Sequence, residues 1–217
     1  GEMASSVAHE LNQPLTAILA NAQAVRRILD AGQADLIEVR AIVDDIVDDD
    51  KRASDVIGRL RSLLKKGALE RSSLDMSELV GQVARLVAAD AVLRGVVVEL
   101  ELAPDLPPVA ADRVQLQQVV MNLILNGLDA MRDSAVGGRI LLLRTAREGE
   151  GSVAVTVEDS GAGIASTELG QVFDAFYTTK ANGLGMGLAI VKSIVEAHGG
   201  RVEARNNPTG GATFSFA

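Results

Sequence analysis

Apolar residues recur every three or four positions through the first 66 residues, and this period limits what the N-terminal part of the chain can become. Between 36 and 66 they are Val39, Ile42, Ile46, Ala53, Val56, Leu60 and Leu63. Such spacing is typical of helices that pack along a seam. The stretch 30–35 interrupts the pattern, so we expect two helices joined by a short loop. Because a hairpin alone buries only one apolar stripe, the pattern predicts a dimeric four-helix bundle.

Five aspartates crowd the second of these helices, at positions 44, 45, 48, 49 and 50. We expect this acidic run to lie on a solvated helix face, with a docking surface for a basic partner as the alternative. Asp49 falls where the seam requires an apolar residue. The packing register is therefore interrupted once.

The segment VAHELNQPL, residues 7–15, combines a helical pattern with a proline. Pro14 lacks the N–H that would bond the Glu10 carbonyl, which costs about 3 kcal/mol inside a helix and favours a kink there. A neutral imidazole such as that of His9 is a nucleophile, and the adjacent Glu10 can orient its ring. Gln13 follows one turn later, where its amide could position a water molecule. Alone, the segment fits an exposed histidine beside a tolerated kink equally well.

Composition excludes several classes of function. The 217 residues carry 21 basic and 29 acidic side chains, and this net charge of −8 argues against non-specific binding of nucleic acid. No cysteine is present, which excludes disulfides and thiolate metal sites. No apolar run approaches the roughly 20 residues that span a bilayer, and no signal peptide is visible. Because the sequence begins inside an apparent helix, we interpret it as a fragment whose upstream part has been removed.

After residue 67 the pattern changes to helices and strands without strict βαβ alternation, which predicts an α+β sandwich with a mixed sheet. The predicted helices are 76–91, 111–133 and 186–198, and the predicted strands are 96–102, 139–147, 152–158, 201–205 and 212–216. We therefore expect two domains, 1–67 and 68–217.

The predicted helix 111–133 carries a polar stripe. Asn122, Asn126 and Asp129 are spaced i, i+4, i+7 and so share one face, while leucine and isoleucine cover the other. Amide oxygens suit Mg²⁺, which prefers oxygen ligands. A stripe that simply faces solvent is the alternative.

Two glycine-rich stretches follow. In EDSGAG, Asp159 ends an apolar strand, where it can accept a hydrogen bond from an exocyclic amine, and Gly161 and Gly163 allow a flat ring to approach the backbone. A tight turn would give the same pattern. In GLGMG, residues 183–187, the glycines precede an amphipathic helix and can present backbone N–H groups to phosphate.

Between these stretches, residues 173–180 hold three of the five aromatic residues of the chain. We interpret them as a mobile lid with an apolar anchor, although a small local core under a loop would also fit. The proposed lid residues are Phe173, Phe176, Tyr177, Thr178 and Thr179. His198 precedes two glycines at a predicted helix end, so we expect it to cap the helix and exclude it from catalysis.

Taken in order, the motifs resemble those of bacterial sensor histidine kinases. HELNQPL resembles the phospho-acceptor motif, NLILNGLDAM the N box, DSGAG the first glycine box, FDAFYTTK the F box and GLGMGLAIVK the second glycine box. The sequences of these motifs are most similar to those of the oxygen-sensor and dicarboxylate-sensor kinases of nitrogen-fixing bacteria. The resemblance implies a phosphotransfer hairpin followed by an α/β-sandwich ATP-binding domain of the gyrase, heat-shock 90, histidine kinase and MutL type.

The resemblance also implies roles for individual residues. His9 would be the phospho-acceptor, Glu10 its base or orienting group, and Gln13 a candidate for phosphatase activity. Asn126 would bind Mg²⁺ and Asp159 the adenine amine. The other nucleotide-binding residues would be Asn122, Gly161, Gly163, Lys180, Gly183, Leu184, Gly185, Gly187 and Leu188. Asp129 stands where many of these kinases carry lysine or arginine, so it receives no phosphate role.

The implied function is autophosphorylation of a histidine by ATP and Mg²⁺, followed by phosphoryl transfer to an aspartate of a response-regulator receiver domain. We expect a cytoplasmic homodimer with no membrane contact within this fragment. One rival is an ATPase of the same superfamily that drives a clamp, but the glutamate it needs is replaced by Asn122. The other is a nucleotide-binding pseudokinase scaffold, which the intact motifs disfavour.

Overall fold

The computed structural model describes residues 2–32, 35–64, 69–132, 134, 138–149, 151–180 and 185–217, without the side chains of 2–11, 55, 56 and 58–64. The chain divides into two compact units, Gly1–Lys66 and Gly67–Ala217.

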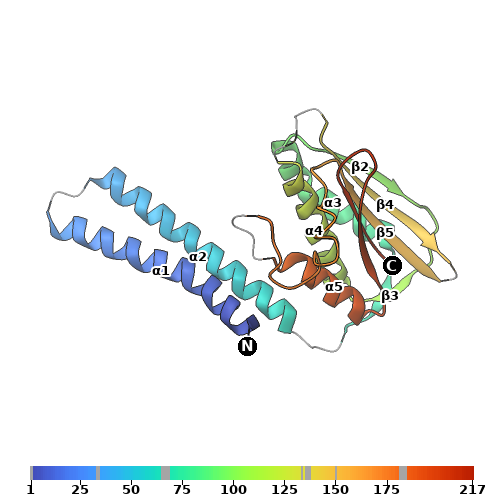
Figure 1. Cartoon of the computed structure of the whole chain (residues 1–217), viewed down its shortest axis with the longest axis horizontal. Helices are drawn as coiled ribbons and strands as arrows, with labels where there is room; N and C mark the ends of the chain where they lie inside the picture. Colours follow the sequence, from blue (N-terminus) through green and yellow to red (C-terminus); the bar gives the residue numbers. More distant parts are fainter. Residues whose placement is uncertain are drawn as a thin grey trace. The chain divides into compact units, whose positions relative to one another are not determined.

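The N-terminal unit is an antiparallel hairpin of two helices, α1 (Glu2–Asp30) and α2 (Leu36–Leu64) (Figure 1). The predicted helical hairpin is therefore confirmed. Helix α1 runs through Pro14, whose side chain is buried. Large apolar side chains remain exposed along both helices, namely Leu15, Leu19, Leu29, Leu36, Ile37, Val43, Val47 and Ile57. A single hairpin thus leaves apolar surface uncovered, as the seam pattern predicted.

The acidic run of α2 divides into two environments. Asp44, Asp45, Asp48 and Asp50 are exposed, as predicted for a solvated face. For Asp49 that prediction is wrong: this residue is only 8% exposed, because it occupies the seam position. Its carboxylate accepts a hydrogen bond from the Arg52 guanidinium at 2.9 Å.

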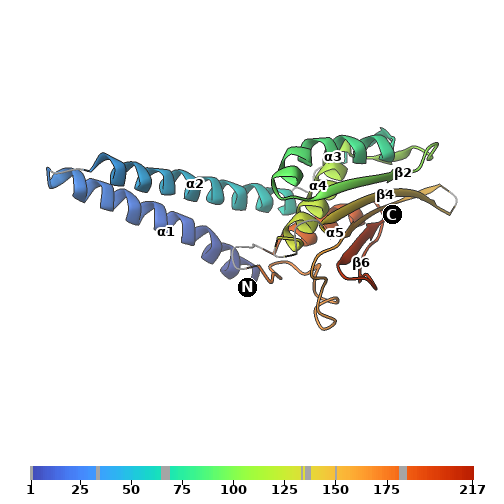
Figure 2. The same cartoon turned by 90° about the horizontal axis from the view of Figure 1, so that it is seen from above.

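The C-terminal unit is a two-layer α+β sandwich, and the predicted fold class is confirmed. Three helices cover one face of a five-stranded sheet (Figures 1 and 2). The helices are α3 (Met76–Leu93), α4 (Arg113–Ala130) and α5 (Gly187–Ala197). The strands are β2 (Val97–Leu102), β4 (Ile140–Glu148), β5 (Ser152–Asp159), β6 (Val202–Asn206) and β7 (Ala212–Phe216).

The strand order is β2-β4-β5-β7-β6. Strands β2 and β4 are parallel and the other neighbours antiparallel, so the sheet is mixed, as predicted. Alternate residues of β5 are buried, which places Val153, Val155, Val157 and Asp159 on one face. The strand thereby delivers an acidic side chain to the same face as three valines.

Two short strands were not predicted. Strand β1 (Ser72–Leu74) pairs antiparallel with β3 (Val109–Ala111). The helix predicted at 111–133 accordingly begins later, at Arg113, because 109–111 is strand and Asp112 is the N-cap. The Asp112 carboxylate accepts hydrogen bonds from the N–H groups of Val114 and Gln115.

Helix α4 is anchored by its apolar face. Its buried side chains include Leu116, Val119, Val120, Leu123, Ile124 and Leu128. Leu123 and Ile124 are fully buried, and each such burial stabilises the fold by about 2 kcal/mol. The rigidly held helix therefore fixes the direction of its polar face.

Candidate functional site

Asp159 is the last residue of β5, and it is only 3% exposed. Its Oδ1 accepts hydrogen bonds from the backbone N–H groups of Gly161 at 2.8 Å and Ala212 at 3.3 Å. Its Oδ2 accepts none from the part of the chain that the structure describes. Burial raises the pKa of Asp159 above 3.8, the two N–H groups oppose the rise, and Glu158 adds to it. One carboxyl oxygen is thus fixed while the other is available to a ligand.

Two glycines permit close backbone contacts around Asp159. A Cβ on Gly161 would lie 2.6 Å from the carbonyl oxygen of Ala130 and 2.9 Å from Oδ1 of Asp159. A Cβ on Gly211, in the β6–β7 turn, would overlap the Asp159 carbonyl oxygen. Gly211 was not predicted as a site residue, although the pair Gly210-Gly211 stands between two predicted strands. Gly161 also ties the end of β5 to the end of α4.

The first glycine box contacts the β6–β7 turn as well. A Cβ on Gly163 would lie 3.0 Å from Oδ1 of Asn206 and 3.2 Å from the carbonyl oxygen of Gly211. Asn206 bonds Ile164 in both directions, accepting from its N–H at 2.8 Å and donating to its carbonyl at 2.6 Å. The turn after β5 is therefore supported by the neighbouring β6–β7 hairpin.

The polar face of α4 meets the start of α5. Asn122 Nδ2 donates to the Gly187 carbonyl at 3.4 Å, and a Cβ on Gly187 would lie 3.9 Å from Asn126 Nδ2. The two predicted asparagines and the last glycine of GLGMG are therefore together in space. Leu188 follows in the first turn of α5 and is half-buried.

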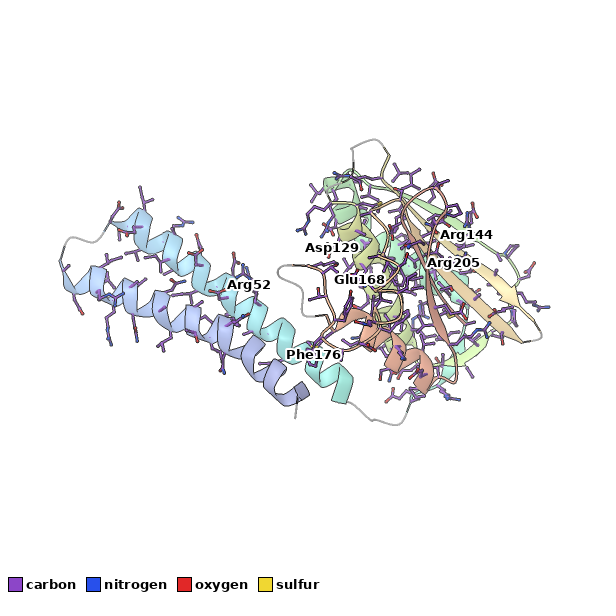
Figure 3. The ribbon with its side chains drawn as sticks, in the orientation of Figure 1. Arg52, Asp129, Arg144, Glu168, Phe176 and Arg205 are labelled. Atoms are coloured by element: carbon purple, nitrogen blue, oxygen red, sulfur yellow. The ribbon has the colours of Figure 1, made fainter. Side chains whose placement is uncertain are left out.

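Asp129, labelled in Figure 3, continues this face and forms ion pairs with three cations, Lys180, Arg94 and, at 3.6 Å, Arg132. Lys180 Nζ donates to its Oδ2 at 2.7 Å and to Asn126 Oδ1 at 3.3 Å. Arg94 donates to its Oδ1 at 2.7 Å. Burial disfavours ionisation of Asp129, but the hydrogen bonds and charges of Lys180 and Arg94 outweigh it and lower the pKa of Asp129. Arg94 was not predicted as a site residue, because no local sequence pattern marks it.

The segment 171–180 is attached at both ends of its aromatic run. The edge of the Phe173 ring meets Phe214, with centroids 6.3 Å apart and planes at 89°. The Phe176 N–H donates to the Gly185 carbonyl at 3.0 Å. Phe176 has φ of +69° and Gly185 of +62°, and a Cβ on Gly185 would lie 2.5 Å from the Tyr177 carbonyl oxygen. Gly185 is therefore required where the two motifs touch.

The remaining lid residues are at the surface. Tyr177 is half-buried, and Thr178 and Thr179 are exposed. The Lys180 N–H donates to Thr178 Oγ1 at 3.1 Å. This bond forms a short polar turn that presents Lys180 to α4.

Other predicted residues fall elsewhere. Gly183 and Leu184 lie outside the described residues. His9 and Glu10 are in helix α1, and their side chains are also outside the described part. Gln13, one turn later, is exposed. The structure thus brings together the N box, both glycine boxes and the F box, all within the C-terminal unit.

His198 is the C-cap residue of α5, as predicted. Its Nε2 accepts from the Asp112 N–H at 3.0 Å, which requires an unprotonated Nε2. Its Nδ1 therefore carries the proton and donates to the Ile194 carbonyl at 2.8 Å. The neutral imidazole joins the end of α5 to the start of α4 and has no free nitrogen for catalysis.

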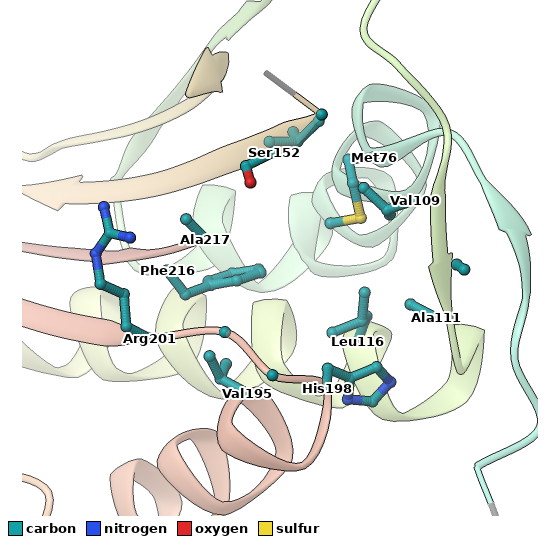
Figure 4. A pocket seen from close by; sticks show the side chains of 15 residues that line it. Met76, Val109, Ala111, Leu116, Ser152, Val195, His198, Arg201, Phe216 and Ala217 are labelled. Atoms are coloured by element: carbon teal, nitrogen blue, oxygen red, sulfur yellow. The ribbon is translucent and has the colours of Figure 1, made fainter. Parts of the chain in front are cut away.

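A cavity of about 470 Å³ lies near His198 (Figure 4). Buried apolar side chains line it, among them Met76, Leu116, Val195 and Phe216. None of the predicted nucleotide-binding residues belongs to its lining. The cavity is therefore separate from the convergence of motifs at Asp159 and Asn126.

Comparison with protein-family models places two domains on the chain. Residues 1–69 match the His Kinase A (phospho-acceptor) domain. Residues 111–217 match the histidine kinase-, DNA gyrase B-, and HSP90-like ATPase. Fold and site thus define a phospho-acceptor hairpin joined to an ATP-binding domain of this superfamily.

Two curated relatives match the chain across both of these domains. The chain is 40% identical over 218 residues to the sensor protein FixL of Bradyrhizobium diazoefficiens, which covers all of this chain and 43% of FixL. It is 37% identical over 215 residues to the C4-dicarboxylate transport sensor protein DctS of Rhodobacter capsulatus, covering 99% of this chain and 33% of DctS. The chain therefore spans less than half the length of these curated relatives.

A solved structure has the same architecture over almost the whole chain. Full-length ShkA in complex with AMPPNP superposes with a TM-score of 0.72 at 26% identity, covering 99% of this chain and 45% of ShkA. The chain belongs to the bacterial sensor histidine kinases, of which it holds the kinase core. The predicted family is confirmed. Within the residues that the structure describes, no helix is long and apolar enough to cross a membrane.

Proposed function

We propose that this core binds ATP with Mg²⁺, transfers the γ-phosphoryl group to His9, and passes it to an aspartate of a response-regulator receiver domain. One observation carries the proposal. Asp159, with its available Oδ2, and the amide face of α4 lie in the same unit of a chain that also holds a phospho-acceptor domain. ShkA, of the same architecture, is a complex with AMPPNP, which supports a nucleotide site here.

The nucleotide fits the residues present. Oδ2 of Asp159 is an acceptor for the adenine amine, since Oδ1 is already engaged. Gly161 and Gly163 leave room for the ring. Gly183, Leu184, Gly185, Gly187 and Leu188 would surround the phosphates at the start of α5, where backbone N–H groups attract anions.

Mg²⁺ fits the donors of α4. Oδ1 of Asn126 already contacts the ammonium of Lys180, so this oxygen is accessible to a cation, and amide oxygens are suitable ligands. Asn122 lies one turn before it. The metal would supply neutralisation of the phosphate oxygens, which phosphoryl transfer needs more than covalent assistance.

The chemistry of the chain's own residues follows. A ring nitrogen of His9 forms a bond to the γ-phosphorus, and the bond to the β-bridging oxygen breaks, which releases ADP. Glu10 orients the imidazole and accepts its proton. In the second step a carboxylate of the receiver domain attacks the phosphorus and the P–N bond breaks. The proton that Glu10 accepted returns to the ring, which regenerates the neutral imidazole.

The organisation we propose has a phosphotransfer hairpin at 1–67 and a catalytic domain at 68–217. The exposed apolar stripe of α1 and α2 supports a homodimer through a four-helix bundle. Gln13, exposed near His9 on α1, is our candidate for a phosphatase role toward the receiver domain.

Incubation with γ-labelled ATP distinguishes the candidate functions. A histidine kinase gives a phosphoprotein whose label is lost in acid and kept in base. A clamp-driving ATPase releases phosphate without labelling the protein, and a pseudokinase does neither. Label that is stable in acid, or no label at all, would refute the proposed phosphorylation of a histidine.

A further inference from the structure

Lys180 contacts two side chains of α4, Asn126 and Asp129. The ammonium of Lys180 lies 3.3 Å from Asn126 Oδ1 and 2.7 Å from Asp129 Oδ2. These two oxygens come from adjacent turns of α4 and converge on one positive charge. Without a nucleotide, the lysine therefore lies on the same amide oxygen that we assign to Mg²⁺.

The other side of Asp129 is held independently. Arg94 bonds Oδ1 at 2.7 Å and is itself paired with Asp90 at 3.0 Å, and Arg132 lies 3.6 Å from the same oxygen. Asp129 therefore keeps a cationic partner if Lys180 departs. Among the described residues, Asp129 is the acidic partner of Lys180.

The Lys180–Asp129 pair is weak enough to exchange. The side chains are 43% and 29% exposed, and ion pairs this open to solvent contribute at most about a fivefold change in an equilibrium constant. Such a pair can hold a flexible lysine in place, but it yields to an incoming triphosphate, because a charge-assisted bond to phosphate is stronger.

Metal and ammonium exclude each other at Asn126. Mg²⁺ binds oxygen at about 2.0–2.1 Å, and two cations on one amide oxygen repel each other. Binding of the metal must therefore move Lys180 away from Asn126. In this structure the Phe176 N–H donates to the Gly185 carbonyl, and the Lys180 side chain can leave Asn126 without breaking that bond.

We propose that Asp129 is a positioning residue of the nucleotide site: it holds Lys180 against Asn126 while the site is empty, and nucleotide binding transfers the ammonium from this position to the triphosphate. The second part of this inference, the transfer of the ammonium to the triphosphate, rests on the proposed function. The first part, the contact that holds Lys180 against Asn126, concerns the nucleotide-free protein alone. Asp129 thus gains a role through Lys180, without touching phosphate itself.

The first test is hydrogen–deuterium exchange of segment 171–180 in the nucleotide-free chain. Asp129→Asn and Lys180→Met each remove the pair, so each should accelerate exchange in this segment, and the double variant should add nothing further. Glu101→Gln is the matched control, because it also removes one ion pair, the one between Glu101 and Arg144 on the sheet. Wild-type exchange in Asp129→Asn would overturn the proposal.

The second test is calorimetric titration with AMPPNP and Mg²⁺. Asp129→Asn should bind up to about fivefold more tightly, because no pair must be broken. Lys180→Met should weaken binding, and by a larger factor in the Asp129→Asn background than in the wild type. Weaker binding by Asp129→Asn would contradict the proposal. A wild-type chain that binds no analogue would refute the proposed function, while the exchange rates would still decide whether Asp129 holds Lys180.

Discussion

Gly211 lies against the carbonyl oxygen of Asp159, so close that a Cβ on residue 211 would overlap that oxygen. The contact joins the β6–β7 turn to the end of β5, and the next residue, Ala212, donates its N–H to Oδ1 of Asp159. The position of the proposed adenine acceptor is therefore set by a turn about fifty residues further along the chain.

Gly211→Ala should displace Asp159 and weaken nucleotide binding by about tenfold or more, since a misplaced buried acceptor loses its bond to the ligand. Titration with AMPPNP measures the effect. Gly210→Ala is the matched control, because Gly210 also has positive φ, +97° against +85°, but nothing lies within 4 Å of its Cβ position. Equal losses in the two variants would attribute the effect to backbone strain instead of contact.

Periodicity explains why most of the fold was predictable. Helices α3 and α5 and all five strands of the main sheet lie within two residues of the predicted bounds. The two helices each bury one face, and β5 buries every second residue. Strands β1 and β3 were missed because three residues are too few to show alternation. The start of α4 was misplaced for the same reason, since the end of β3 was assigned to the helix.

The candidate site was predictable only where a motif is local. Asn126 and Asp159 stand within recognisable stretches, but Arg94 reaches Asp129 across 35 residues. Gly211 likewise acts on a strand distant in sequence. Contacts of this kind depend on how the elements pack, and no spacing within the sequence records them.

Asp159→Asn should weaken nucleotide binding while stabilising the nucleotide-free protein at neutral pH. Asparagine retains Oδ1 for Gly161 and Ala212, but it presents an N–H donor to the adenine amine in place of an acceptor. We expect affinity for AMPPNP to fall by about tenfold to a hundredfold.

The stability effect has a defined pH window. Because the pKa of Asp159 is raised in the folded protein, its stabilising contribution is complete below its ordinary value of 3.8 and is lost as the pH rises through the raised pKa. The gain in unfolding free energy of Asp159→Asn over wild type should therefore grow from pH 3.5 to pH 7. Urea unfolding across this range, with the exposed Glu196→Gln as control, measures it. A gain that shrinks with pH would contradict the buried-carboxyl explanation.

His198→Ala should destabilise the catalytic unit without changing nucleotide affinity. The substitution leaves the Asp112 N–H without its partner, while the Ile194 carbonyl keeps the backbone N–H of residue 198 as a donor. This loss costs about 1–3 kcal/mol of unfolding free energy. Urea unfolding provides the measurement, and Lys192→Ala, an exposed change on the same helix, is the control. Loss of affinity at unchanged stability would show that His198 does more than cap α5.

Asp49→Leu should stabilise the hairpin unit. Asp49 occupies an apolar seam position with Arg52 as its ion-pair partner, and replacing a buried ionic group by a well-packed apolar one gains about 1–4 kcal/mol in favourable cases. Thermal unfolding followed by circular dichroism checks this. Asp48→Leu, one residue earlier and 64% exposed, should give no gain. A less stable Asp49→Leu protein would mean that the carboxylate is needed for the packing register.

His9→Ala should abolish incorporation of label from γ-labelled ATP, because no other nucleophile in the proposed mechanism accepts the phosphoryl group. Affinity for AMPPNP should stay within about twofold of wild type, a difference of about 0.4 kcal/mol, since the proposed nucleotide residues all belong to the C-terminal unit. The sequence supplies its own control: it contains two histidines, and His198→Ala, measured where it remains folded, should still be labelled. Label retained by His9→Ala would assign the phospho-acceptor to another residue, and label lost only from His198→Ala would reverse the two assignments.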